Sequence, residues 1–170
     1  MSLLNKEAVK RAAKKLKEFD ENLFVVELEN SAKTALDAAN SLNCDVGAIV
    51  KSLLIKVQTK YLLCLVAGDK RCSLNKLKNI KNEKNVKMAS PAEVKSQTGY
   101  TIGGVSPIGH INEIEIFIDN SLSRFSEIYA AAGHPNVIFK INFKSLKQIT
   151  NAEIKEITEW NKLTSLIISY

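Results

Sequence analysis

The chain is poor in the residues that build disulfide frameworks and metal sites. It has three cysteines, Cys44, Cys64 and Cys72, without C-x-x-C spacing, and two histidines, His110 and His134, without an H-E-x-x-H pattern. Disulfide scaffolds need paired cysteines, and zinc sites need clustered thiol or imidazole ligands. We therefore expect neither kind of site, and we expect any chemistry to proceed without a metal or cofactor.

Long apolar runs are also missing. No stretch approaches the about 20 apolar residues that cross a bilayer, and the start, MSLLNKEAVKRAAKKLKEF, has no apolar segment followed by a small-residue cleavage site. These absences predict a cytoplasmic protein with no membrane contact. A length of 170 residues is enough for one domain with its own core.

Glycine is scarce and unevenly placed. Four of the seven glycines fall within TGYTIGGVSPIG at 98–109. Glycine is favoured where φ is positive or where another group approaches the backbone closely, so this loop is a candidate ligand cradle. It fits neither the phosphate-binding G-x-x-x-x-G-K-[ST] motif nor the dinucleotide-binding G-x-G-x-x-G motif. The amides from Gly103 to Val105 can hold an oxyanion, and a tight structural turn explains the same glycines at least as well.

Three polar residues are candidates for chemistry. Lys51 lies in the apolar, strand-like run IVKSLLI, so its ammonium must either reach solvent or face a cleft. Ser106 lies outside any G-x-S-x-G elbow and precedes Pro107, which has no amide donor, so a turn hydrogen bond explains it better than a nucleophilic role. His134 follows a glycine in AAGHPN, a position more typical of a turn than of a catalytic base.

Positive charge is in excess and is concentrated in two segments. The net charge is +6, and residues 70–87 and 1–17 carry seven and six basic side chains, each set against one acidic residue. Lysines on the solvated faces of helices explain this pattern without a polyanionic partner. Neither segment contains the interleaved aromatic residues that stack single-stranded bases. A landing surface for a phosphate backbone stays open as the alternative.

Hydrophobic periodicity predicts interleaved helices and strands. The expected strands are residues 23–28, 50–57, 61–68, 114–119 and 137–143, with the second and third joined by the polar QTK as an antiparallel hairpin. The expected helices are residues 5–19, 31–42, 74–80, 91–98 and 121–133, followed by short C-terminal helices. Ser31, Ser73 and Ser90 are the expected helix caps, and Gly99 is an expected helix stop. The order predicts one α+β domain with a mixed sheet.

Several segments together resemble a known family. IVKSLLI at 49–55, QTGYTIGGVSPIG at 97–109, FIDNSL at 117–122 and EIYAAAGHP at 127–135 occur in the order and spacing of the YbaK family, the free-standing relatives of the prolyl-tRNA synthetase editing insertion domain. The resemblance covers about Val25 to Ile149. It implies a mixed, curved β-sheet with surrounding helices.

Chain length, hydrophobic periodicity and the resemblance together predict how the chain is organised. One domain is expected to span residues 1–170, with its core at about 20–150. A basic N-terminal helix at 5–19 is expected to precede the core, and a helical tail at 151–170 to follow it.

The resemblance also implies an activity, that of a metal-independent aminoacyl-tRNA deacylase acting in trans on a wrongly charged tRNA, most often proline tRNA. Lys51 matches the family's essential lysine, and Gly103 to Pro107 match its G-x-x-x-P loop. Lys51, Gly103 and Gly104 are thus the expected catalytic residues. The expected substrate-binding residues are Thr34, facing inward on the helix after Ser31, and Ser52, Val105, Ser106, Pro107 and His134.

One departure from the family pattern bears on specificity. The turn GHP at 133–135 differs from the basic, glycine-containing stretch of members that remove cysteine, and looks more like relatives that clear alanine. We expect alanine or 2-aminobutyrate as cargo, with cysteine or serine next. The expected partners are the acceptor end of proline tRNA and prolyl-tRNA synthetase, and of the possible oligomeric states a monomer is favoured. An inactive tRNA- or protein-binding module of the same fold, or hydrolysis of another small ester, stays open.

Overall fold

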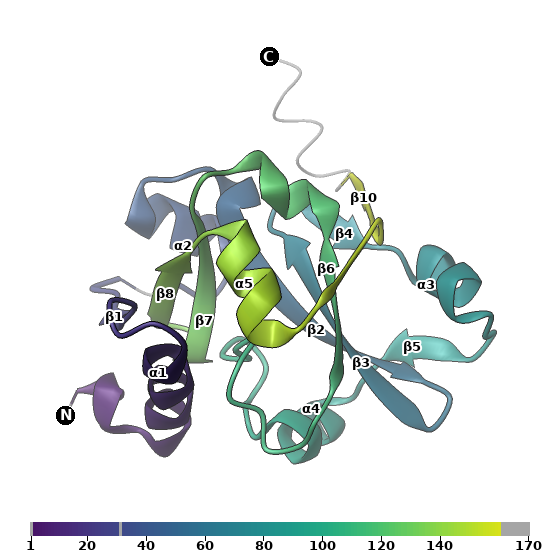
Figure 1. Cartoon of the computed structure of the whole chain (residues 1–170), viewed down its shortest axis with the longest axis horizontal. Coiled ribbons are helices and arrows are strands. Elements are labelled where there is room, and N and C mark those ends of the chain that lie inside the picture. The colour runs from purple at the N-terminus through teal and green to yellow at the C-terminus, as the bar shows by residue number, and fades with distance from the viewer. Residues whose placement is uncertain (1, 31, 161–170) are drawn as a thin grey trace.

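The computed structural model describes residues 2–30 and 32–160, which fold around a curved sheet of mixed direction (Figure 1). Its strands, in spatial order, are β1 (Val25–Glu27), β8 (Val137–Ile141), β7 (Ile128–His134), β2 (Ile49–Val57), β3 (Lys60–Ala67), β6 (Glu115–Asp119) and β9 (Glu153–Lys155). A further strand, β5 (Val86–Met88), pairs with β2, and β4 (Lys70–Cys72) pairs separately with β10 (Thr158–Trp160). Parallel and antiparallel pairs share one sheet, so the predicted α+β fold is confirmed.

Within the described residues, five α-helices surround the sheet, and none is long and apolar enough to span a membrane. They are α1 (Glu7–Phe19), α2 (Ala35–Leu42), α3 (Leu74–Lys81), α4 (Pro91–Thr98) and α5 (Phe143–Thr150), with 3-10 turns at Leu3–Asn5, Val46–Ala48 and Asn120–Arg124. The predicted caps Ser73 and Ser90 begin α3 and α4, and Gly99 ends α4 at a φ of 79°. Thr34 caps α2, whereas the predicted cap Ser31 lies outside the described residues.

The predicted hairpin of β2 and β3 is confirmed, and it forms the centre of the sheet. The strands pair antiparallel around a tight turn in which Gln58 has a φ of 56°. Every residue from Leu62 to Ala67 is buried, because alternate side chains of β3 enter two apolar clusters on opposite faces. The strand β3 therefore contributes to the core on both faces of the sheet.

Two segments predicted to be helical are strands. Residues 121–133 form a 3-10 turn followed by β7, in which alternate side chains from Ile128 to Ala132 are buried. Alanine favours a helix intrinsically, but β7 is paired on both edges, with β8 and with β2, and this pairing decides its conformation. The predicted helical tail at 151–170 is wrong where it is described, because β9 and β10 pair with β6 and β4 there. Residues 161–170 of that tail lie outside the described residues.

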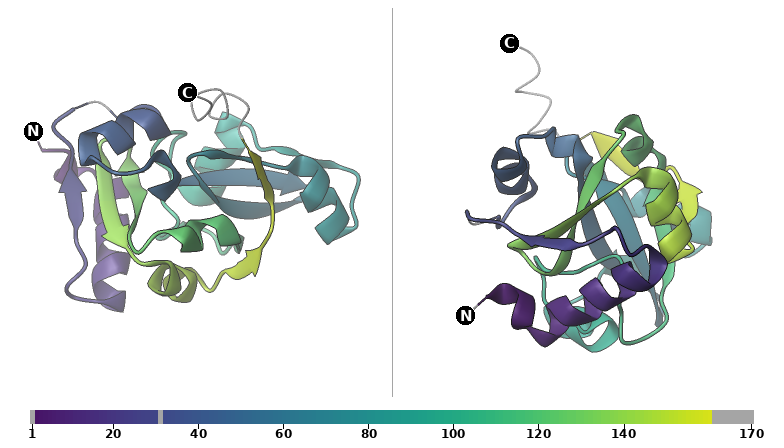
Figure 2. Two further views of the ribbon diagram at one scale, coloured as in Figure 1. Left: turned by 90° about the horizontal axis from the view of Figure 1, so that it is seen from above. Right: turned by 60° about the vertical axis from the view of Figure 1, so that its left-hand side comes forward.

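The helices α1 and α2 lie on opposite faces of β7 (Figure 2). α1 packs so closely that a Cβ on Gly133, which has a φ of 90°, would lie 2.7 Å from the backbone of Ala8. On the other face, Tyr129 packs with the apolar cluster under α2. β7 therefore separates the N-terminal helix from the space beneath α2.

Candidate active site

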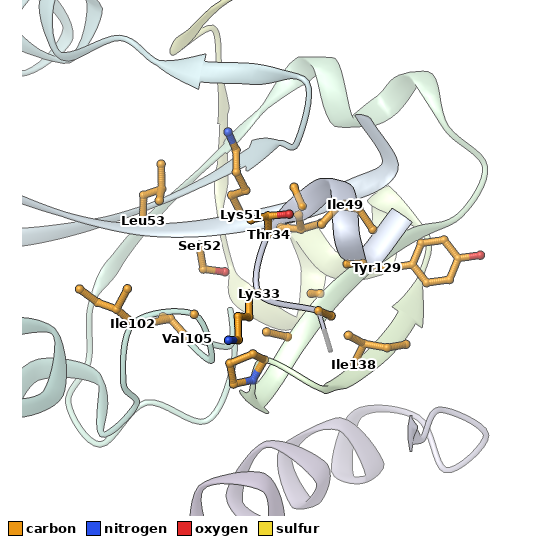
Figure 3. Close-up of a pocket in the computed structure, with 18 of the residues that line it drawn as sticks. Lys33, Thr34, Ile49, Lys51, Ser52, Leu53, Ile102, Val105, Tyr129 and Ile138 are labelled. Carbon is orange, nitrogen blue, oxygen red and sulfur yellow. The ribbon is translucent and has the colours of Figure 1, made fainter. Parts of the chain in front are cut away.

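A cavity of about 350 Å³ opens beside β2, between α2 and the glycine-rich loop (Figure 3). Its described lining comprises Ala32, Lys33, Thr34, Ala35, Ala38, Ile49, Val50, Lys51, Ser52, Leu53, Leu54, Met88, Ala89, Val94, Ile102, Gly103, Val105, Tyr129, Ala130, Ala131, Pro135 and Ile138. Among these residues the only charged side chains are Lys33 and Lys51, and none is Asp, Glu or His. Nor does the described part of the chain cluster three or more His, Cys, Asp or Glu side chains that could hold a metal ion.

The cavity exists because β2 lacks a continuous neighbour on one edge. β7 pairs with β2 only at 49–50, and β5 pairs with it only at 55–57. The opposite edge stays paired with β3 throughout. Residues 51–54 therefore border the cavity along an open strand edge, which ends where the N–H of Ala89 donates to the carbonyl of Leu54 at 3.0 Å.

Lys51 and Ser52 leave this edge on opposite sides of the strand (Figure 3). The Lys51 side chain extends toward β4, where its Nζ donates to the carbonyl oxygen of Lys70 at 2.5 Å. Burial lowers the pKa of Lys51 below its usual value, and the nearby Asp69 opposes part of that shift. Ser52 lies on the side of Val105, and its Oγ is buried without a hydrogen-bond partner among the described residues. A molecule lying along the edge would have the Lys51 side chain on one side of the strand and the Ser52 side chain on the other.

The glycine-rich loop contributes only part of its backbone to the cavity. Gly103 lines the cavity together with Val105, whereas Gly104 is buried behind them. The N–H of Gly104 donates to the carbonyl of Thr101 at 3.0 Å, so it is already used within the loop. A Cβ at Gly104 would lie 2.9 Å from the backbone of His134. Gly104 is therefore explained by the close approach of the 133–135 turn.

The other predicted substrate-binding residues are divided between the cavity and its surroundings. Thr34 lines the cavity, but its hydroxyl accepts a hydrogen bond from the first turn of α2 at 3.1 Å. Ser106 and Pro107 are buried and do not contact the cavity. His134 does not line it either. Its Nδ1 accepts a hydrogen bond from the N–H of Asn136 at 3.0 Å, and burial lowers the pKa of the imidazole.

Most of the cavity lining was not predicted from the sequence, and Pro135, Tyr129 and Lys33 are three instructive examples. Pro135 lies one position beyond His134, and a Cβ on Gly103 would come within 3.3 Å of its ring, so the GHP motif was the signal that could have found it. Tyr129 lies in the segment predicted to be helical, where the period-two burial of β7 would have placed it on the cavity face. Lys33 carries no sequence signal that separates it from other exposed lysines.

Comparison with known proteins identifies the family and supports the fold. Residues 29–149 match the family described as the aminoacyl-tRNA editing domain. The chain belongs to this family, which confirms the resemblance seen in the sequence. A solved structure described as a candidate trans-editing enzyme for prolyl tRNA synthetase has a TM-score of 0.86 and 34% identity, covering 91% of this chain and 98% of that chain.

Relatives among curated proteins fall into free-standing proteins and longer ligases. YwhH of Bacillus subtilis, an uncharacterized protein, is 32% identical over 131 residues, which are 76% of this chain and 83% of YwhH. EbsC of Enterococcus faecalis, provisionally named a Cys-tRNA(Pro)/Cys-tRNA(Cys) deacylase, is 27% identical over 126 residues, 74% of this chain and 77% of EbsC. The proline–tRNA ligase of Caldicellulosiruptor saccharolyticus is 26% identical over 130 residues, 76% of this chain. The match spans only 22% of that ligase.

Proposed function

We propose that this protein is a trans-editing aminoacyl-tRNA deacylase that hydrolyses the ester of a small amino acid wrongly attached to proline tRNA. The observation that carries the proposal is the cavity along the open edge of β2, with Lys51 and Gly103 both in its lining. Membership of the editing-domain family supports it, as do the names given to EbsC and to the similar solved structure.

Little catalytic machinery is required, because an aminoacyl ester is already activated. Water attacks the ester carbonyl carbon, the bond to the ribose oxygen breaks, and that oxygen takes up a proton. The protein needs to position the ester, exclude bulk water and stabilise the oxyanion. Since no Asp, Glu or His lines the described cavity, we propose that the substrate's own ribose hydroxyl orients the attacking water.

Each proposed catalytic residue has a separate task. The Lys51 ammonium supplies positive charge beside the ester or the terminal phosphate, and its partial burial strengthens that charge's effect on a developing anion. Gly103 lets the substrate approach the loop backbone closely, because no side chain stands in the way. The N–H of Gly104 is already bonded within the loop, so Gly104 contributes by letting the loop pack closely against the backbone of His134.

The wall formed by α2 and β7 favours a small amino-acid side chain. Ala35 and Ala38 of α2 and Ala131 of β7 line it, with Ala32 just before α2, and the described lining has no acidic residue to attract a charged side chain. We propose alanine or 2-aminobutyrate as the preferred cargo, with cysteine or serine next. The name given to EbsC is a reason to keep cysteine in the assay. One methylene in such a pocket is worth about 1–3 kcal/mol, so some cross-reactivity among small residues is expected.

The proposed partner is the acceptor end of a tRNA. We propose that the protein acts as a monomer and corrects the charging errors of prolyl-tRNA synthetase. Two lysine-rich surfaces support binding of a phosphate backbone. Lys14, Lys15 and Lys17 are exposed on α1, and Lys84 and Lys87 are exposed after α3. Phosphate contacts release counterions, so affinity for tRNA should fall steeply as salt is raised.

Hydrolysis of the ester on proline tRNA charged with alanine tests the proposal directly. Release of alanine faster than in a reaction without protein is the expected result. Salt-sensitive binding of the tRNA without release would instead indicate an inactive binding module of the same fold. Cleavage of simple esters together with intact alanyl-tRNA would indicate a different hydrolase.

A further inference from the structure

Along the open edge of β2, the N–H and C=O groups of alternate residues point away from β3. In an antiparallel pair, alternate residues direct both N–H and C=O toward the partner strand. The carbonyl of Ile49 accepts the N–H of Gly68 at 2.8 Å, so the odd-numbered residues of β2 bond toward β3. The carbonyl of Leu54 accepts instead from Ala89 on the opposite edge, as this alternation requires. The N–H and C=O of Ser52 consequently point toward the cavity.

No described residue pairs with Ser52 on that edge. β7 has left β2 after Val50, and β5 joins only at Ile55. The backbone of Ser52 makes no hydrogen bond there with any residue in the described ranges. Its Oγ is buried and equally without a partner in the same part of the chain. Ser52 therefore offers a backbone donor and a backbone acceptor to whatever fills the cavity, and unpaired backbone groups of this kind call for a partner.

These groups complement the main chain of an amino acid. An aminoacyl ester carries a carbonyl oxygen that needs a donor and an α-amino group that needs an acceptor. The described cavity lining has no carboxylate, so neutral acceptors must serve the α-amino group. A ligand that adds to a strand edge gains affinity from main-chain hydrogen bonds and leaves side-chain selection to adjacent pockets.

We propose that Ser52 recognises the free α-amino group of the substrate, through its backbone carbonyl, while its N–H donates to the ester carbonyl. The inference rests on the proposed deacylase function and specifies the chemical class of substrate: esters with an unblocked α-amino group, whatever the side chain. Selection among side chains is left to the alanine-lined wall of α2 and β7. Peptidyl and N-blocked esters are excluded, because they cannot satisfy the Ser52 carbonyl in the same way.

Three esters on one proline tRNA test this proposal: alanyl, isobutyryl and N-acetylalanyl. Isobutyryl replaces the amino group of alanine with a methyl group of similar size, so it removes the donor without adding bulk. Each rate is divided by the rate of the same ester without protein. We expect the acceleration to fall at least about tenfold for both analogues, the scale of one lost charge-assisted hydrogen bond. Equal acceleration of alanyl and isobutyryl esters overturns the proposal, even if the N-acetyl ester is slow, because that loss would be steric.

A binding experiment separates this inference from the proposed function. If no ester is hydrolysed, the deacylase function fails, but the edge can still be probed with 3′-alanylamido-3′-deoxyadenosine and its isobutyrylamido counterpart. A change in the amide resonance of Ser52 with the first compound and not with the second supports recognition at the edge. Equal or absent changes with both compounds overturn it.

Ser52→Ala distinguishes the backbone from the hydroxyl. The variant keeps both backbone groups and removes only the buried hydroxyl, so it should keep the preference for alanyl over isobutyryl ester. Ser96→Ala is the matched control, since Ser96 is exposed on α4 and donates only to the carbonyl of Glu93. Loss of the preference in Ser52→Ala would show that the hydroxyl, and not the strand edge, recognises the amino group.

Discussion

Removing the Lys51 ammonium separates its catalytic from its structural contribution. Lys51→Ala deletes the charge, and Lys51→Met deletes it while keeping an unbranched side chain. In both variants the carbonyl of Lys70 loses its 2.5 Å hydrogen bond, and an unpaired carbonyl costs about 1–3 kcal/mol. The burial that lowers the pKa of Lys51 is relieved at the same time, so the free energy of unfolding should fall by less than about 2 kcal/mol.

The expected loss of activity is larger than this loss of stability. Removing one donor that stabilises a developing oxyanion costs about 2.7–4 kcal/mol, or roughly 100- to 1,000-fold in rate. Single-turnover deacylation of alanyl-tRNA, together with urea denaturation, measures both quantities on the same samples. Lys56→Met is the matched control, because Lys56 lies on the same strand outside the cavity lining and its Nζ lies 2.6 Å from Oε1 of Glu93. Near-wild-type turnover in Lys51→Ala, or an equal loss in Lys56→Met, would refute the role of Lys51.

Three further predictions concern packing, pH and metals. Gly133→Ala, at a φ of 90° and with a new Cβ 2.7 Å from Ala8, should lower the free energy of unfolding by more than about 1 kcal/mol, and wild-type stability in urea would contradict the close packing of α1. Hydrogen bonds from Lys56 and from the backbone of Ser90 lower the pKa of Glu93 to about 2, below its ordinary 4.5. The ionised Glu93 carboxylate therefore stabilises the folded state above pH 4.5, and this stabilisation is lost as the pH falls toward 2. The difference in Tm between wild type and Glu93→Gln should shrink over that interval, and a constant difference would contradict the lowered pKa of Glu93. A chelator should leave deacylation unchanged; loss of activity that zinc restores would show that a metal takes part.

Local signals were sufficient for the helix caps and the central hairpin. The hydroxyl of Ser90 and the carboxylate of Glu93 bond to each other's backbone within four residues, so the sequence alone identifies the start of α4. The strand β7 could not be predicted in this way. Its alanines favour a helix intrinsically, but α1 requires small side chains at Ala130 and Ala132, and two neighbouring strands hold the segment extended.

The glycine-rich loop indicated where the cavity lies but not what approaches each glycine. Gly103 borders the cavity. Gly99 instead makes room for Arg11 of α1, Gly109 for the hydroxyl of Tyr100, and Gly104 for the backbone at the end of β7. A sequence can show that a close approach occurs, but the approaching group comes from another part of the chain.

The open edge at Ser52 illustrates the same limit. Its unpaired backbone depends on where β7 and β5 stop pairing with β2, and neither end point has a local signature in IVKSLLI. Lys51 was identified through a family motif, whereas the partner of its ammonium, the carbonyl of Lys70, became known only from the structure. Residue types were thus predictable, and the groups they face were not.

The relative rates of deacylation of alanyl-, 2-aminobutyryl-, cysteinyl-, seryl- and prolyl-esters on one proline tRNA test the central claim most directly. The alanine-lined wall between α2 and β7 predicts fastest release of alanine or 2-aminobutyrate, slower release of cysteine and serine, and an intact prolyl ester. The five esters should be compared at one protein concentration, each corrected for hydrolysis without protein. Preferential hydrolysis of the prolyl ester, or no acceleration of any ester, would contradict the account.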